Sequence, residues 1–178
     1  DKPDSTGICF IGERPFKSFI QTFLPPMPGN IVTEEGEILG THDGLMYFTL
    51  GQRKDIGIGG LKNHSGDPWY VADKRMNSNE LLVVQGRNHN KLWQKQAFAK
   101  DMNWLNTEFS ERLLKGEKIP CKAKCRYRQT DADCEIELFN DGVKVIFDEA
   151  QWAITDGQYL VIYLNDCCMG GGKIFSEI

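Results

Sequence analysis

The stretch CEIELFNDGVKVIF, residues 134–147, decides the fold of the second half of the chain. Its two ends, residues 134–139 and 143–147, alternate polar with apolar residues or run apolar, as strands with one buried face do. Between them stands Asn140-Asp141-Gly142, and these residue types tolerate the backbone of a tight turn. The stretch therefore predicts two antiparallel strands joined by a short turn.

Further runs of the same kind surround this stretch. They are residues 96–104, 119–128, 159–164 and 172–178, separated by turn signals such as Asp156-Gly157. Six short strands with tight turns favour a small closed antiparallel β-barrel, and the whole region from residue 93 onward is predicted to be β-structure. Gly170-Gly171-Gly172 is interpreted as a bulge or a close approach of two backbones.

The first half of the chain begins with one helical pattern. Phe16, Phe19, Ile20 and Phe23 fall on one side of a helix over residues 13–24, and this stripe is expected to pack into a core. Prolines in residues 24–29 then end the helix.

Short strands in a glycine-rich background follow the helix. They are predicted at residues 31–32, 38–39, 69–72 and 81–84, with Asn77-Ser78-Asn79 as a hairpin turn before the last one. The fold class is therefore mainly β, with a short N-terminal helix. The expected divisions are residues 1–28, 29–92 and 93–178.

Composition excludes several classes of protein. Lys and Arg total 21 and Asp and Glu total 25 in 178 residues, so the net charge of −4 excludes a uniformly basic coat for nucleic acid but allows a local basic patch. The apolar runs are far shorter than the ~18 residues of a membrane span. Six cysteines are too sparse for a disulfide scaffold, so free thiols and a cytoplasmic location are expected.

Residues 121–128, CKAKCRYR, form the most distinctive charged run. On a strand, Lys122, Lys124, Arg126 and Arg128 would share one face, with the cysteines and Tyr127 on the other. This row of cations would suit a phosphate backbone. Equally, it could be a solvated face paired with Glu135 and Glu137 on the next strand, and the residues alone leave both interpretations open.

Cys9 lies in DSTGICFIG, residues 4–12, just before the helix. A thiol near a helix N-terminus can have a lowered pKa and act as a nucleophile, although a lone cysteine is more often a small buried apolar residue.

No metal site is predicted, because the other cysteines lack the spacing of zinc ligands. No nucleotide-binding loop occurs in the chain.

Several motifs together resemble one family, the bacterial tRNA-specific 2-thiouridylases. The resemblance extends over essentially the whole chain, in the order expected for that family. The matching segments are residues 4–12, 44–45, 49–54 with 57–60, 68–71, 126–131, 145–148, 157–158 and 170–172.

The resemblance implies a three-part enzyme: an ATP-pyrophosphatase domain with an S-G-G-x-D-S loop, a small central domain, and a barrel like those of translation factors. This chain has no S-G-G-x-D-S sequence. It is therefore expected to supply the central and C-terminal parts, residues 29–92 and 93–178, preceded by the end of the catalytic domain in residues 1–28. ATP and Mg²⁺ would serve the full-length enzyme, and the isolated chain is expected to bind neither and to be inactive.

The implied reaction makes 2-thiouridine at wobble position 34 of the tRNAs for Lys, Glu and Gln. ATP would adenylate the uridine, and a persulfide on Cys9 would deliver sulfur, with a cysteine of the missing domain then forming a disulfide to Cys9. A persulfide donor or relay protein would load Cys9. Arg126, Tyr127 and Gln158 match positions of the family that contact tRNA, and Lys122, Lys124 and Arg128 would support them.

The segment 49–60, TLGQRKDIGIGG, gives two further alternatives. Arg53 and Lys54 could contact phosphate, or the segment could be a structural glycine-rich turn with exposed charges. Asp55 stands where the family often has glycine, which disfavours a close backbone approach there. An alternative function for the whole chain is a non-catalytic RNA-binding module with a translation-factor-like barrel, in which Cys9 would be inert.

Overall fold

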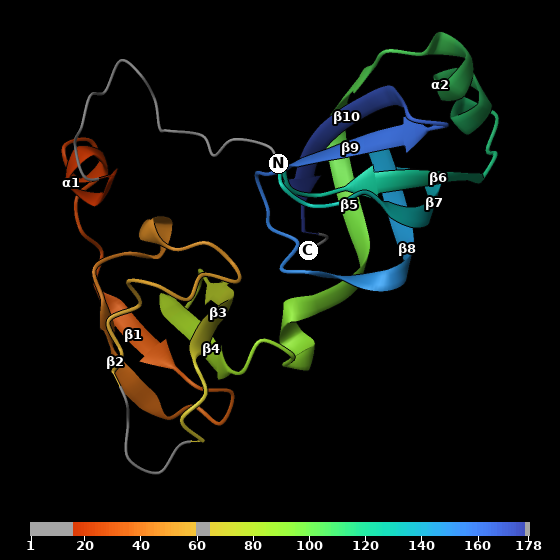
Figure 1. Cartoon of the computed structure of the whole chain (residues 1–178). Helices are drawn as coiled ribbons and strands as arrows, with labels where there is room; N and C mark the ends of the chain where they lie inside the picture. Colours follow the sequence, from red (N-terminus) through yellow and green to blue (C-terminus); the bar gives the residue numbers. More distant parts are fainter. Residues whose placement is uncertain (1–15, 60–64, 177–178) are drawn as a thin grey trace. The chain divides into compact units, whose positions relative to one another are not determined.

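A computed structural model describes residues 16–59 and 65–176 of the chain (Figure 1). The chain divides into two compact units between Arg87 and Asn88. The finer division predicted at residues 28 and 92 stays a prediction. None of the helices in the described residues is long and apolar enough to cross a membrane.

The first unit is built on a small sheet. Its elements are α1 (Phe16–Gln21), β1 (Gly29–Val32), β2 (Ile38–His42), the 3₁₀ turn η1 (Leu45–Tyr47), β3 (Trp69–Arg75) and β4 (Glu80–Gln85). The strands follow the order β2-β1-β4-β3, in which only the β1–β4 pair is parallel. The predicted hairpin turn joins β3 to β4, and Asn79 adopts a left-handed backbone there, with φ at 52°. The core of the first unit contains Ile31, Val71, Leu81 and Val83.

The helix of this unit is shorter than predicted. It ends at Gln21, and the start of the predicted range lies outside the described residues. Phe23 was expected in a core, but its side chain is 68% exposed. It lies in the turn after the helix, where its ring contacts that of Phe19 at 5.2 Å between centroids. The apolar stripe therefore does not form a core around Phe23 within the described residues.

His42 joins three parts of the first unit. The Nε2 atom of this buried side chain donates a hydrogen bond to the carbonyl of Asn79, at 3.2 Å. Gly29 lies so close that a Cβ atom there would come within 2.0 Å of the same carbonyl. Among the described residues, the Nδ1 atom has no hydrogen-bond partner. Burial lowers the pKa of His42 below its ordinary value, partly offset by Asn79 and Asp43.

Lowering the pH through about 6.5 is therefore expected to destabilise the first unit. The unfolded chain binds a proton at His42 near the ordinary pKa, whereas the folded side chain stays neutral to a lower pH. Stability is thus full above this range and falls as the pH falls. Hydrogen exchange of the β1 and β4 amides at about pH 7.5 and about pH 5.5 measures the change. His42→Gln keeps a donor for Asn79, and equal pH dependence in this variant would contradict the assignment.

The second unit is a closed barrel. It consists of the 3₁₀ turn η2 (Asn90–Leu92), β5 (Trp93–Trp104), α2 (Thr107–Leu114), β6 (Ile119–Lys124), β7 (Ala132–Phe139), β8 (Gly142–Trp152), β9 (Tyr159–Leu164) and β10 (Cys167–Phe175). In the described residues the strand order is β10-β5-β8-β7-β6-β9, and every neighbouring pair is antiparallel (Figure 1). The predicted six-stranded antiparallel barrel is confirmed.

Alternating side chains fill the barrel. Ile136, Val145 and Phe147 from the opening stretch are buried together with Leu160 and Ile162. The predicted glycine cluster allows backbones to approach closely, since a Cβ at Gly171 or Gly172 would lie within 2.7 or 2.6 Å of a carbonyl oxygen on a neighbouring strand. Register shifts flank these glycines on both sides of β10, as predicted for a bulge.

The helix α2 corrects the prediction that everything after residue 93 is β-structure. Asn106 caps it, because its side-chain oxygen accepts a hydrogen bond from the Phe109 amide at 2.8 Å. Phe109 and Leu113, four residues apart, bury one side of the helix. This cap and this spacing were visible in the sequence, but the helix is only 8 residues long and presents a short pattern.

Candidate nucleic-acid interface

The predicted basic strand ends earlier than expected. β6 ends at Lys124, so the prediction that four cations share one strand face is wrong beyond that residue. The amide of Cys125 binds the Oε1 atom of Gln129 at 3.2 Å, and the amide of Gln129 binds the carbonyl of Arg126 at 3.1 Å. These hydrogen bonds close a turn over residues 125–129. Tyr127, expected on the opposite strand face from the cations, with the cysteines, does not share their burial and is 63% exposed.

Lys122 and Lys124 do follow the predicted alternation. They flank Ala123, which is completely buried, so they lie on the outer side of β6. Lys122 lies 3.8 Å from the carboxylate of Asp131, and the Lys124 ammonium lies 4.7 Å from the ring centroid of Tyr163. An exposed ion pair of this kind contributes at most about 1 kcal/mol, so a phosphate can compete for the lysine.

The glutamates of the next strand have other partners. Glu137 lies 2.7 Å from Lys118 and 3.8 Å from Lys144, while Glu135 lies 3.9 Å from Lys118. The Lys118 hydrogen bond is the main cause of the lowered pKa of Glu137. These ion pairs do not join Glu135 or Glu137 to Lys122, which the β6–β7 register places opposite Asp133.

Arg126 connects the turn to a distant loop. Its Nη2 atom donates hydrogen bonds to the carbonyl of Ala153 at 2.7 Å and to the hydroxyl of Thr155 at 3.2 Å. The guanidinium also lies over the ring of Trp152, at 5.3 Å from its centroid. Burial lowers the pKa of Arg126, although such a side chain stays charged.

A second hydrogen-bonded connection joins the turn at residues 125–129 to β8. The Gln129 amide group donates a hydrogen bond to the side-chain oxygen of Gln151, whose own amide donates to the carbonyl of Glu149 at 2.8 Å. The turn 125–129 is thus fastened to the end of β8 at two places. Sequence reasoning missed Gln129, Gln151 and Thr155, because their partners are far away along the chain.

The loop at residues 153–158 carries the remaining predicted site residue. Gln158 is exposed there, and its backbone is held by the carbonyl of Thr155 at 3.2 Å and the amide of Ile174 at 2.7 Å. Since Arg126 binds Ala153 and Thr155, the barrel brings the turn with Tyr127 against the loop with Gln158. We call residues 125–129 and 153–158 together the turn–loop surface.

The cysteines divide into a buried and an exposed group. Cys9 lies outside the described residues, and the other five are free thiols. Cys121 and Cys134 face each other across β6 and β7, with 3.7 Å between the sulfur atoms. Burial raises the pKa of Cys125 to about 12, and the contact with Cys121 is the main cause of the raised pKa of Cys134. The thiols of Cys125 and Cys134 are therefore poor nucleophiles at neutral pH. Within the described ranges, no group of three or more side chains could hold a metal ion.

The two units define a class of protein: a small sheet unit followed by a closed six-stranded β-barrel. The model of the tRNA methyl transferase PRC-barrel domain matches residues 17–85, and that of the aminomethyltransferase beta-barrel domain matches residues 94–174. Two relatives named tRNA-specific 2-thiouridylase MnmA, from Haemophilus influenzae and Shewanella pealeana, are 52% and 53% identical to 99% and 98% of the chain. A third from Marinobacter nauticus is 49% identical.

The chain belongs to the family of tRNA-specific 2-thiouridylases. It matches the central and C-terminal parts of these proteins. It spans 45% of the length of the Haemophilus influenzae relative and 46% of the Shewanella pealeana relative.

Proposed function

We propose that this chain is the tRNA-holding part of a cytoplasmic tRNA-uridine 2-sulfurtransferase. The observation that carries the proposal is the identity of about half of all residues to 2-thiouridylases over 98–99% of the chain. The product is 2-thiouridine at wobble position 34 of the tRNAs for Lys, Glu and Gln. ATP and Mg²⁺ act in the part of the enzyme that lies outside this chain, where the uridine is activated at C2 as an adenylate.

Cys9 is the proposed sulfur carrier. After a donor or relay protein has loaded it as a persulfide, the terminal sulfur attacks C2 of the uridine and displaces AMP. A second cysteine then attacks Cys9, which breaks the S–S bond, leaves sulfur on the uridine and forms a disulfide between the two cysteines. A thiol reductant must restore both thiols before the next reaction.

The turn–loop surface is the proposed tRNA contact of the barrel. Tyr127 presents an exposed ring that can stack on a base or donate a hydrogen bond, and Gln158 adds an exposed side-chain amide. Lys122, Lys124 and Arg128 lie on or next to β6 and supply positive charge for phosphates. Arg126 holds the turn in place, through its bonds to Ala153 and Thr155.

Tyr127→Ala is expected to lower the affinity for a tRNA-Glu transcript about tenfold, the effect of losing one aromatic contact with a base. Fluorescence anisotropy at a fixed salt concentration measures the change. Tyr127→Phe should retain most of the affinity if the ring stacks. Leu114→Ala removes another exposed apolar side chain on α2, far from the turn in sequence, and should bind like the original chain. Unchanged affinity of the Tyr127→Ala variant would remove this residue from the proposed interface.

A further inference from the structure

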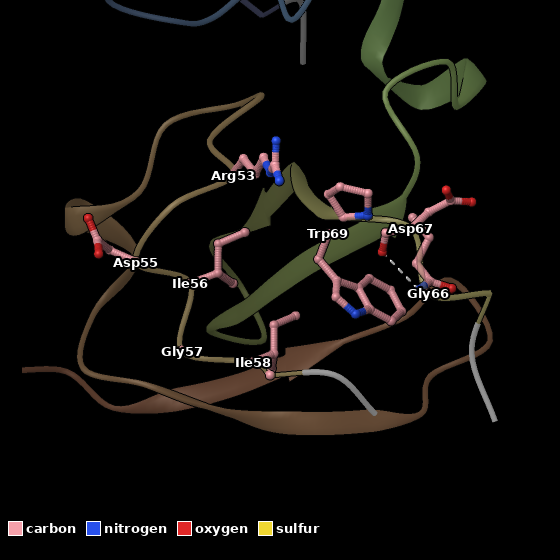
Figure 2. Close-up of a pocket in the computed structure, with 11 residues that line it drawn as sticks. Arg53, Asp55, Ile56, Gly57, Ile58, Gly66, Asp67 and Trp69 are labelled. Atoms are coloured by element: carbon pink, nitrogen blue, oxygen red, sulfur yellow. Dashed lines mark hydrogen bonds between the residues drawn. The ribbon is translucent and has the colours of Figure 1, made fainter. Parts of the chain in front are cut away.

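The glycine-rich segment of the first unit forms one wall of a pocket. The pocket has a volume of about 370 Å³, within the ~300–1,000 Å³ that is typical of sites for small ligands. Arg53 and residues 55–59 form one side, and residues 66–69 with Gln85 form the other (Figure 2). The turn–loop surface belongs to the second unit, so this pocket is a separate feature of the molecule.

Hydrogen bonds hold the second wall in shape. The Gln85 side chain accepts a hydrogen bond from the Ser65 amide at 3.3 Å and donates one to the carbonyl of Asp67 at 3.1 Å. The Ser65 hydroxyl donates to the carboxylate of Asp67 at 3.0 Å, and the Gly86 amide donates to the carbonyl of Pro68 at 2.9 Å. The polar groups of this wall therefore form hydrogen bonds with one another, which fixes the shape of the wall.

The first wall is anchored in the same way. The Gln52 carbonyl accepts a hydrogen bond from the Val71 amide of β3 at 3.0 Å, and the Gly51 amide donates one to the Val71 carbonyl at 2.7 Å. The Gln52 side chain donates to the carbonyl of Lys54 at 2.8 Å. Ile56 is buried in the core of the unit. This wall of the pocket is therefore ordered before a ligand binds, so binding does not have to order it.

The lining combines a flat apolar surface with one cation. Ile56, Ile58 and Trp69 line the same space, and Figure 2 shows the carboxylates of Asp55 and Asp67 directed away from it. Arg53 lies at the rim, and in the described part of the chain its side chain has neither a hydrogen bond nor an ion pair. Gly57, Gly59 and Gly66 line the pocket, and a Cβ atom at any of them would meet no atom of the described residues within 4 Å.

We infer that this pocket binds one unstacked nucleotide of the RNA substrate, an inference that rests on the proposed function. A planar base can stack on the indole of Trp69 and contact the two isoleucines, while Arg53 binds the adjoining phosphate. Single-stranded loops of folded RNA present such bases, and proteins commonly recognise them by stacking on aromatic side chains. Lys54 is the natural comparison for Arg53, since it is the next residue but does not line the pocket.

The test compares three variants of the 178-residue chain in binding to an unmodified tRNA-Glu transcript. Gly59→Leu adds a bulky side chain at a residue that lines the pocket, where the backbone does not require glycine, and Arg53→Ala removes the cation. Gly59→Leu should lower the affinity about 5- to 100-fold, the range for losing one stacked base. Arg53→Ala should lower it about tenfold, the effect of losing a hydrogen bond between charged groups. Lys54→Ala, the matched control, should lower it by no more than about twofold, as expected for one solvated charge. Circular dichroism and thermal unfolding should match the original chain for all three.

A set of transcripts with single abasic sites in the loops identifies the base itself. At one position the missing base should weaken binding to the original chain about tenfold, but should have almost no effect on the Gly59→Leu variant, because the pocket is already filled. If Gly59→Leu and Arg53→Ala bind tRNA as tightly as the original chain, or if Lys54→Ala loses as much affinity as Arg53→Ala, the pocket is not a nucleotide site although the proposed function stands. If the original chain does not bind tRNA, the proposed function fails first.

Discussion

Cys9→Ser is expected to abolish sulfur transfer when the chain is joined to the remaining part of the Haemophilus influenzae relative. The original chimera should form 2-thiouridine, because the chain is 52% identical to the part that it replaces. A serine hydroxyl cannot carry a persulfide, so the variant should lose activity by a factor on the order of a thousand or more, as other enzymes do when the nucleophile is removed. Mass spectrometry of nucleosides from digested tRNA measures the product.

Two exposed cysteines supply the control for this experiment. Cys167→Ser and Cys168→Ser remove accessible thiols of the barrel and should leave the formation of 2-thiouridine unchanged. The Cys9→Ser chimera should still bind tRNA, since the turn–loop surface is intact. Full activity of the Cys9→Ser chimera would reject the role proposed for this residue and would favour the alternative of a module that only binds RNA.

Arg126→Ala is expected to weaken tRNA binding about a hundredfold and also to destabilise the barrel. The side chain donates two hydrogen bonds from a partly buried position, and hydrogen bonds of a charged group contribute about 1.5–3 kcal/mol each. Without them the turn loses its connection to Ala153 and Thr155, so Tyr127 and Gln158 lose their relative positions. Urea unfolding followed at the barrel, together with anisotropy titrations of tRNA, measures both effects.

Arg126→Lys separates the two roles that this residue could have. A lysine keeps the charge but cannot reproduce the planar donor geometry over Trp152, so this variant should also lose stability and most of the affinity. Arg128→Lys is the matched control on the exposed part of the same turn and should remain within about twofold of the original chain. If Arg126→Ala leaves stability unchanged and Arg126→Lys restores binding, the residue acts as a phosphate contact and not as an anchor.

The two sequence predictions that were wrong in the barrel have a common cause. The run at residues 119–128 keeps the alternation of a strand, yet β6 ends at Lys124 because Gln129 turns the chain back through the amide of Cys125. Residues 107–114 form a helix because Asn106 caps them and Phe109 with Leu113 find a place in the core. In both cases a pattern of a few residues was compatible with two structures, and contacts with other residues selected one of them.

By itself the sequence determined the six strands of the barrel and most of its turns, because burial of one strand face leaves an alternation that can be read locally. It also contained the motifs that place the chain among the 2-thiouridylases. Only the tertiary structure decided which cation holds another part of the chain and which cation lines a pocket. Closure of the barrel brings Arg126 to Thr155, and the fold of the first unit brings Arg53 to Trp69. Such pairs depend on how strands and loops pack in space, and the spacing of residues along the sequence does not indicate this packing.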